Sequence, residues 1–174
     1  GISAGDIVNF GDQYEYRVIS VATNDLTIVR KEEPQHFVAS DSSGLHATIT
    51  NGAAVRRRWK YYDLFDKAPG TSPAASALGA SNDELHVVVV DEDGTITGTK
   101  GDVLETYAAV SKGSDAKTPQ GDVNYYPDVI YNKSNYIYWM DHNSSGTNWG
   151  SALSGITFTD VTAVSNVSLS NLSD

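Results

Sequence analysis

A run of four valines, Val87 to Val90, constrains the fold more than any other feature of this 174-residue chain. A strand with one face in solvent alternates apolar and polar residues, whereas these valines are apolar in both directions. The run therefore predicts a central strand that is covered on both faces. The acids Asp91, Glu92 and Asp93 follow it. Gly94 comes next and suits the positive φ of a short hairpin that leads into "TIT", with the acids in solvent at its tip.

The sequence Asp-Glu-Asp-Gly also invites comparison with a calcium-binding loop, which needs glycine at its sixth position and a bidentate Glu at its twelfth. If Gly94 is the sixth position, the first is Val89 and the twelfth is Lys100, so the match fails at both ends. The hairpin interpretation is therefore favoured, and no metal site is expected here.

Other chemical motifs are also missing from the sequence. There is no cysteine, and the histidines lack the HxxxH or HxH spacing of a zinc site. No GxSxG nucleophile motif and no glycine-rich phosphate loop occurs. We therefore expect no catalytic residues, no cofactor and no metal. The four histidines are His36, His46, His86 and His142.

The first 64 residues have the pattern of short β-strands. Tyr14, Tyr16 and Val18 point to one side while Glu15, Arg17 and Ile19 point to the other, which is the period of a half-buried strand. Residues 1–64 therefore predict a small β-barrel-like or curled-sheet module. Its strands are expected within 5–11, 14–22, 25–31, 46–50 and 54–62, with turns at Asn24-Asp25 and Asn51-Gly52.

The composition changes after this module. Residues 65–83 are rich in Ala, Gly, Ser and Pro without apolar periodicity, and predict a loop or linker. Residues 84–174 predict a mixed sheet with one or two helices, so the whole chain is expected to be a β-rich α+β protein. The segment 102–111 could be a strand or a helix, and its β-branched Val103 and Val110 favour a strand. After it we expect a helix in 122–134 that has Pro127 in its first turn and Asp122 or Asn124 as its cap, and then a strand in 135–140.

The charge of the chain bears on its partners. The formal net charge is −10, which opposes binding to nucleic acid and to anionic membranes. No apolar run approaches the roughly 20 residues of a membrane-spanning helix. We expect neither nucleic acid nor a membrane as a partner.

One basic cluster, "RRRWKYY", stands out against this acidity. In a strand, Arg56, Arg58 and Lys60 would share one face while Arg57 and the neighbouring rings share the other. Nucleic acid remains an alternative ligand, but pairing with carboxylates of the same or a neighbouring protomer is favoured. Arg56, Arg57, Arg58 and Lys60 are therefore the candidate inter-subunit contacts.

A second class of function rests on aromatic side chains. The N-terminal module could bind a carbohydrate or a receptor if several rings formed a stacking platform, although such rings more commonly belong to the core. The rings in question are Tyr14, Tyr16, Trp59, Tyr61 and Tyr62.

Several sequence blocks carry a resemblance to a known family. The blocks "VVVVDEDG", "ITGTKG", "VLETY", "VSKGSDAK", "NYYPDVI" and "NYIYW" occur in this order, with "RRRWKYYDLFDKAPGTS" before them and "GTNWG" after them. Together they make residues 55–150 resemble the tail sheath proteins of contractile-tailed bacteriophages, in the T-even-like branch that includes phages of cyanobacteria. Residues 1–54 resemble that family more loosely.

The resemblance implies a structural protein of the virion, assembled in the host cytoplasm. Sheath subunits form stacked hexameric rings around the tail tube and contract to drive the tube into the host. The family has no catalytic residues to carry over. A core domain of the family has been compared with a subtilisin-like fold, but a shared fold would not imply shared chemistry.

The resemblance also predicts the state of this chain in solution. Sheath subunits exchange strands with their neighbours through extended terminal arms, and neither arm is evident here. We therefore expect an internal fragment of a sheath subunit, truncated within the 84–174 part, that is a monomer or a weak oligomer. Light scattering that found stable hexamers or tubes of this chain would contradict that expectation.

Overall fold

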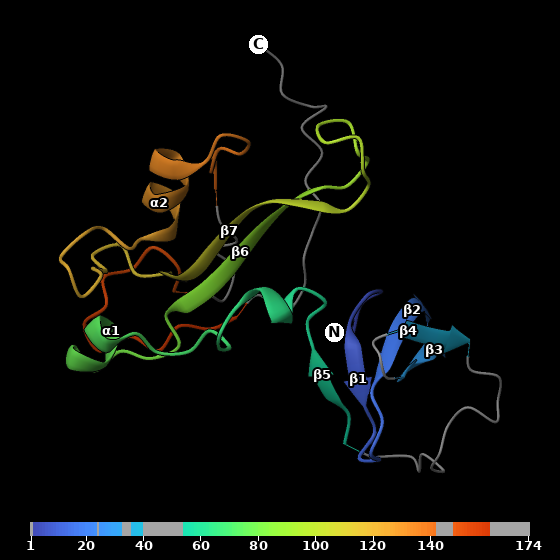
Figure 1. Cartoon of the computed structure of the whole chain (residues 1–174). Helices are drawn as coiled ribbons and strands as arrows, with labels where there is room; N and C mark the ends of the chain where they lie inside the picture. Colours follow the sequence, from blue (N-terminus) through green and yellow to red (C-terminus); the bar gives the residue numbers. More distant parts are fainter. Residues whose placement is uncertain (1, 24, 33–35, 40–53, 142–147, 161–174) are drawn as a thin grey trace. The chain divides into compact units, whose positions relative to one another are not determined.

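The computed structural model describes residues 2–23, 25–32, 36–39, 54–141 and 148–160. The chain divides into two compact units, Gly1–Leu64 and Phe65–Asp174, which we call unit 1 and unit 2. Each is described by itself below. The described part contains one five-stranded sheet, one two-stranded sheet and two short α-helices (Figure 1). The predicted β-rich α+β class is therefore confirmed.

Unit 1 is an antiparallel sheet in the order β4-β3-β2-β1-β5. Within the described residues β4 and β5 form the two edges, so the sheet is open and the barrel alternative is not found. The expected strand in 46–50 and the Asn51-Gly52 turn lie outside the described residues. The strands are β1 Ile7–Asn9, β2 Tyr16–Ala22, β3 Asp25–Glu32, β4 His36–Ala39 and β5 Arg56–Arg58.

The strand expected in 54–62 is much shorter than predicted. Only Arg56–Arg58 pair with β1, and the chain then enters a 3-10 helix, η1, at Tyr62–Leu64. The hydrogen bond from Tyr62 N–H to Trp59 O, 2.9 Å long, turns the backbone at this point. The ladder ends because these backbone groups bond locally instead of across the sheet.

The core of unit 1 lies on one face of its sheet. Val8, Tyr16 and Val18 are fully buried there, whereas Arg17 and Ile19 are exposed. The predicted alternation is thus confirmed from Tyr16 to Ile19, whereas the register shifts between Val18 and Ser20 and the strand is exposed from there to Ala22. Each fully buried apolar side chain contributes roughly 1.5–3 kcal/mol to the free energy of unfolding.

Unit 2 is built around an antiparallel hairpin, the long two-stranded ribbon of Figure 1, formed by β6 Glu84–Asp91 and β7 Asp102–Ser111. The strand predicted in 102–111 is confirmed. Among the described strands β6 pairs with β7 alone, and of its four valines only Val89 is buried. The prediction of a central strand covered on both faces is therefore wrong. "TIT" lies in the turn between the strands rather than in the second strand.

Helix α2, Tyr126–Lys133, packs against this hairpin. The predicted helix is confirmed, with Pro127 in its first turn. The expected caps are wrong, because Tyr125 is the N-cap residue and makes no side-chain capping bond. The side chain of Asn124 instead donates from Nδ2 to Ala109 O at 3.0 Å. The packed cluster consists of Val89, Tyr107, Val110, Tyr126, Val129 and Ile130.

The strand expected in 135–140 is not formed. Ser134 Oγ accepts hydrogen bonds from the N–H groups of Tyr136 and Ile137 at 3.1 and 3.0 Å. Glu105 Oε1 accepts the N–H of Asn135 at 2.8 Å. These side chains bind the backbone donors that a strand ladder would need, so the aromatic alternation alone does not produce a strand.

Residues 65–83, expected to be a loop or linker, form part of the packing of unit 2. They contain helix α1, Pro73–Ala77, whose N-cap is Ser72. Ala75 and Ala80 are buried in a cluster with Leu153 and Phe158. The small side chains that suggested a linker let the backbone pack closely against this cluster instead.

Candidate interaction surface

The predicted basic cluster begins on β5, and its pairing with β1 determines which way each side chain points. Arg57 lies opposite Val8, whose side chain is in the core, while Arg56 and Arg58 lie opposite Asn9 and Ile7. Opposed residues share a face of a sheet. Arg56 and Arg58 therefore lie on the outer face of the unit 1 sheet, which separates them from Arg57 as predicted.

Three of the four cations already have partners within unit 1. Arg57 Nε lies 3.5 Å from the Oδ2 atom of Asp6, a carboxylate that is only 2% exposed. Arg58 pairs with Glu15, and its guanidinium lies over the ring of Tyr62, 5.4 Å from the ring centroid. The ammonium of Lys60 lies 4.6 Å from the ring centroid of Tyr61. These contacts engage the three cations within unit 1, and carboxylates partly neutralise the two arginines.

Arg56 differs from the other three. Its side chain is exposed and, within the part of the chain that the structure describes, has no hydrogen bond or ion pair. It borders a hollow of about 530 Å³ together with Arg58, Asp12 and Glu15. Both carboxylates there are engaged, because Asp12 accepts the Tyr16 hydroxyl at 2.5 Å and Glu15 pairs with Arg58. Arg56 is thus the member of the cluster available to an external anion.

The aromatic platform considered for carbohydrate binding does not form as a set of five rings. Tyr16 is fully buried and belongs to the core, and Tyr14 packs against that core. Trp59 and Tyr61 stack edge to face with their centroids 5.1 Å apart. Since the ring of Tyr62 lies beneath Arg58, the rings are largely used by their own unit.

The three acids that follow the valine run, Asp91, Glu92 and Asp93, differ in their burial. Glu92 and Asp93 are exposed, as predicted. Asp91 is buried and accepts hydrogen bonds from the N–H groups of Gly94, Ile96 and Thr97, at 3.1, 3.0 and 2.7 Å, and from the Thr97 hydroxyl at 3.0 Å. The bond from Thr97 N–H is the largest reason that the pKa of Asp91 is lowered. Asp91 thus organises the loop, and its placement in solvent was a wrong prediction.

Gly94 has φ +78, and a Cβ there would lie 2.9 Å from Lys100 N. The positive φ predicted for this glycine is therefore confirmed. In the described ranges, no group of three or more His, Asp or Glu side chains is placed to hold a metal ion.

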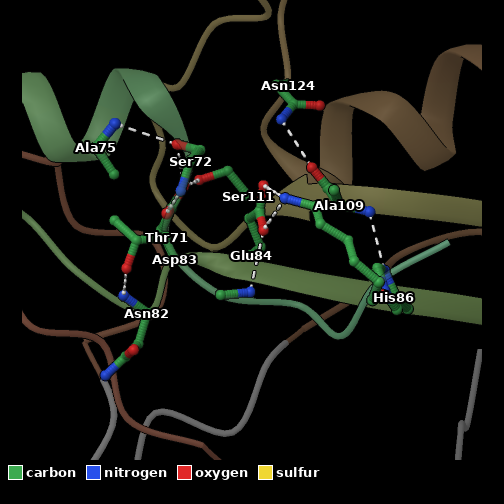
Figure 2. Close-up of polar contacts among 12 residues, drawn as sticks. Thr71, Ser72, Ala75, Asn82, Asp83, Glu84, His86, Ala109, Ser111 and Asn124 are labelled. Atoms are coloured by element: carbon green, nitrogen blue, oxygen red, sulfur yellow. Dashed lines mark hydrogen bonds and ion pairs between the residues drawn. The ribbon is translucent and has the colours of Figure 1, made fainter. Parts of the chain in front are cut away.

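The structure brings together a buried polar centre that the sequence did not indicate (Figure 2). Asp83 is fully buried at the start of the hairpin. It accepts the N–H and the hydroxyl of Ser72 at 2.7 and 2.8 Å and the hydroxyl of Ser111 at 2.7 Å. The two hydroxyls in turn accept the N–H groups of Ala75 and Gly113, each at 3.1 Å.

The Asp83 carboxylate determines the direction of the hydrogen bonds in this centre. A carboxylate can only accept hydrogen bonds, so both hydroxyl protons must point at Asp83 and leave oxygen lone pairs for the two amides. Asp83 therefore joins the N-cap of α1 to the end of β7. The three hydrogen bonds that its carboxylate accepts come from Ser72 and Ser111 within the packed frame of unit 2.

His86 is part of the same region in Figure 2. Its Nδ1 accepts the N–H of Ala109 at 2.9 Å, and its Nε2 lies 2.8 Å from Lys67 O, so the ring carries its proton on Nε2. Ala109 has φ 49, an unfavourable value for a residue with a side chain. The ring also stacks on Phe65 with centroids 4.0 Å apart. His86 thus supports a strained bulge in β7.

Lys112 is the other buried charge near this centre. Its side chain is 2% exposed and its ammonium donates to Asp160 Oδ1 at 2.7 Å and to Asn82 O at 2.9 Å. The ammonium also lies 5.4 Å from the ring centroid of Trp149. These contacts hold residues from three distant parts of unit 2 together.

A cleft of about 660 Å³ lies between β7 and α2. Apolar atoms of Tyr107, Val110 and Val129 line it, and Asp122 and Asp128 stand exposed beside it. Neither acid has an ion-pair partner among the described residues. The cleft therefore combines an apolar lining with two carboxylates that lack an ion pair, against the single lining cation Lys133.

Comparison with known proteins adds no assignment, since no protein-family model, no curated protein and no solved structure matches this chain. In the part of the chain that is described, no helix is long and apolar enough to cross a membrane.

Proposed function

We propose that this chain is part of a tail sheath subunit of a contractile-tailed bacteriophage, a structural protein without catalytic activity. The observation that carries the proposal is the series of ordered sequence blocks between residues 55 and 150, which resemble that family. In this role the subunits form stacked hexameric rings around the tail tube, in the phage tail, and contract to drive the tube into the host. Its partners are other sheath subunits and the tube.

The positions of these blocks in the fold support the proposal. "VVVVDEDG" forms most of β6 and the loop held by Asp91, "VLETY" lies in β7, and "NYYPDVI" leads into α2. These elements pack on one another in unit 2. The blocks that resemble the family therefore belong to elements that pack against one another. Such a set is stronger support for the proposal than motifs scattered over the surface.

The use of the buried polar groups is compatible with a structural role. Asp83 bonds to Ser72 and Ser111, and His86 bonds to backbone groups of Lys67 and Ala109. Each of these groups is satisfied by the frame of unit 2. A catalytic acid or base would instead need to reach a substrate within a cleft.

Expression of the complete reading frame that encodes this chain, followed by negative-stain electron microscopy, tests the proposal. We expect hollow tubes or stacked rings with six-fold symmetry. The 174-residue chain alone is the matched control and should form no tubes. A complete product that stayed monomeric at high concentration, with no rings or tubes under any ionic condition, would contradict the proposed function.

A further inference from the structure

The two units of the chain differ strongly in charge. Unit 1 contains seven Lys and Arg against eight Asp and Glu, whereas unit 2 contains five against 14. Their formal net charges are therefore −1 and −9. Two copies of the chain repel each other as wholes, but a basic surface on unit 1 would be attracted to unit 2 of another copy.

Unit 1 has such a surface on the outer face of its sheet. Arg17 and Arg58 both lie opposite Ile7, and Arg56 lies opposite Asn9, so these three cations share that face. Lys31 reaches the same region, because its ammonium lies 3.7 Å from Glu15. Four cations thus lie on this side of the sheet, two of them, Arg58 and Lys31, paired with Glu15. Arg56 has no ion-pair partner among the described residues and can bind outside the unit.

The cleft of unit 2 presents the complementary chemistry. Asp122 and Asp128 border it, against the single cation Lys133. Asn124 and Asn132 also border it, and each uses its Nδ2 group to donate to a backbone carbonyl, at 3.0 and 2.8 Å. Their side-chain oxygens remain as acceptors. Two carboxylates and two amide oxygens suit the five N–H donors of a guanidinium, and the apolar lining suits its methylene stem.

We infer that the outer sheet face of unit 1, through Arg56, docks into the acidic cleft between β7 and α2 of a second copy of this chain. The contact is heterologous, because each copy offers a different surface to each of its two neighbours, and such contacts generate rings or open chains. The inference rests on the proposed function, since it names the surfaces through which copies of a sheath subunit would meet.

The association should be weak and sensitive to salt. Exposed ion pairs are individually weak, and the Debye length falls from about 10 Å at 0.1 M salt to about 3 Å at 1 M. We expect sedimentation velocity to show association that grows with protein concentration at about 0.05 M NaCl and is lost at about 1 M.

Complementary variants of the whole chain test the geometry. Arg56→Glu reverses the unpaired cation of the basic surface, and Asp122→Lys with Asp128→Lys reverses the two carboxylates of the cleft. Each variant alone should associate about five- to tenfold more weakly than the parent chain, since reversal replaces attraction by repulsion. Mixed in equal amounts, they should at least form a dimer, because the intact basic surface of one variant meets the intact acidic cleft of the other.

Matched controls change the same charges elsewhere in unit 2. Lys100→Glu matches the first variant, and Asp66→Lys with Glu92→Lys matches the second, since all three residues are exposed. Circular dichroism confirms that each variant is folded, and Asp122→Asn with Asp128→Asn replaces the reversal if folding is lost. The controls should associate like the parent chain.

The inference is overturned if Arg56→Glu associates as the parent does, if the controls lose association equally, or if the mixture forms no dimer. It is also overturned if the parent chain is monomeric at all salt concentrations. These outcomes are distinct from failure of the proposed function: six-fold tubes from the complete product without a dimer in the mixture retain the function and reject the docking. A dimer in the mixture without tubes from the complete product would retain the docking and reject the proposed function.

Discussion

Replacing Asp83 by Asn should destabilise unit 2 although the side chain keeps its shape. The Asp83 carboxylate receives three hydrogen bonds of 2.7 to 2.8 Å from Ser72 and Ser111 and is fully buried. If the amide nitrogen takes the Oδ1 position, it meets the N–H of Ser72. If it takes the Oδ2 position, the two hydroxyl protons lose their acceptor. Either orientation places donors against donors.

The size of the effect follows from this count. A hydrogen bond to a charged group is worth about 1.5–3 kcal/mol, and an unsatisfied buried group adds a penalty of its own. Removing the buried negative charge offsets part of the loss. We expect Asp83→Asn to lower the free energy of unfolding of unit 2 by about 2–4 kcal/mol, and Asp83→Ala by about 3–5 kcal/mol, because all three donors then lose their acceptor.

Urea unfolding followed by tryptophan fluorescence measures this loss. Of the three tryptophans, Trp59 lies in unit 1, so a Trp59→Phe background leaves Trp139 and Trp149 to report on unit 2 alone. The matched control is Asp93→Asn, which removes the same charge from an exposed position. A change within about 0.5 kcal/mol for Asp83→Asn, as is usual for surface substitutions, would refute the reasoning.

Three further predictions concern other contacts. Gly113→Ala should destabilise unit 2 by about 1–3 kcal/mol in urea unfolding, because the new Cβ would clash with Leu153 Cδ2. If adding Leu153→Ala does not reduce the destabilisation caused by Gly113→Ala, this clash is not its cause. Arg57→Ala should lower the free energy of unfolding of unit 1 by about 1 kcal/mol or more, because its buried carboxylate partner Asp6 loses a cation, while Arg56→Ala should change it by less than about 0.5 kcal/mol. Equal effects of the two variants in thermal melts would contradict the different roles of Arg57 and Arg56. Burial raises the pKa of Tyr126 to about 12, so its contribution to stability should be complete below pH 10 and lost as the pH rises toward 12; alkaline melts of Tyr126→Phe should lack that component.

The elements that the sequence predicted well are those in which local pattern and tertiary packing agree. Tyr16 and Val18 alternate with exposed positions and are buried as expected. Pro127 indicated the first turn of α2 correctly. Gly94 has the positive φ that its place in a turn required. The apolar alternation was enough to predict the burial of Tyr16 and Val18, and the residue's own conformational preference was enough for Pro127 and Gly94.

The predictions that failed depended on partners far away in the chain. The expected strand in 135–140 is lost partly because Glu105, 30 residues earlier, binds Asn135 N–H. The apolar run of the valine strand predicted a central strand covered on both faces, whereas among the described strands it pairs with β7 only. The Ser72-Pro73 pair was a usable sign of α1, since Ser is a common N-cap and Pro a common first helical residue.

The candidate surface was only partly predictable for the same reason. The sequence showed four neighbouring cations and their alternation on a strand. It did not show that Asp6 would pair with Arg57 or that Glu15 would pair with Arg58, because both acids come from other segments of unit 1. Only these pairings single out Arg56. Asp83 carried no motif, since its partners lie 11 and 28 residues away.

The burial of Lys112 gives unit 2 an internal chemical reporter. Amine-reactive reagents attack an unprotonated, accessible amine, and this amine is 2% exposed and engaged by Asp160 and Asn82. Lys100, Lys117 and Lys133 are exposed and should be acylated quickly in the folded chain. Acylation of Lys112, followed by peptide mass spectrometry, would then proceed only as fast as unit 2 opens. The acylation rate of Lys112 would thereby measure the local opening of unit 2.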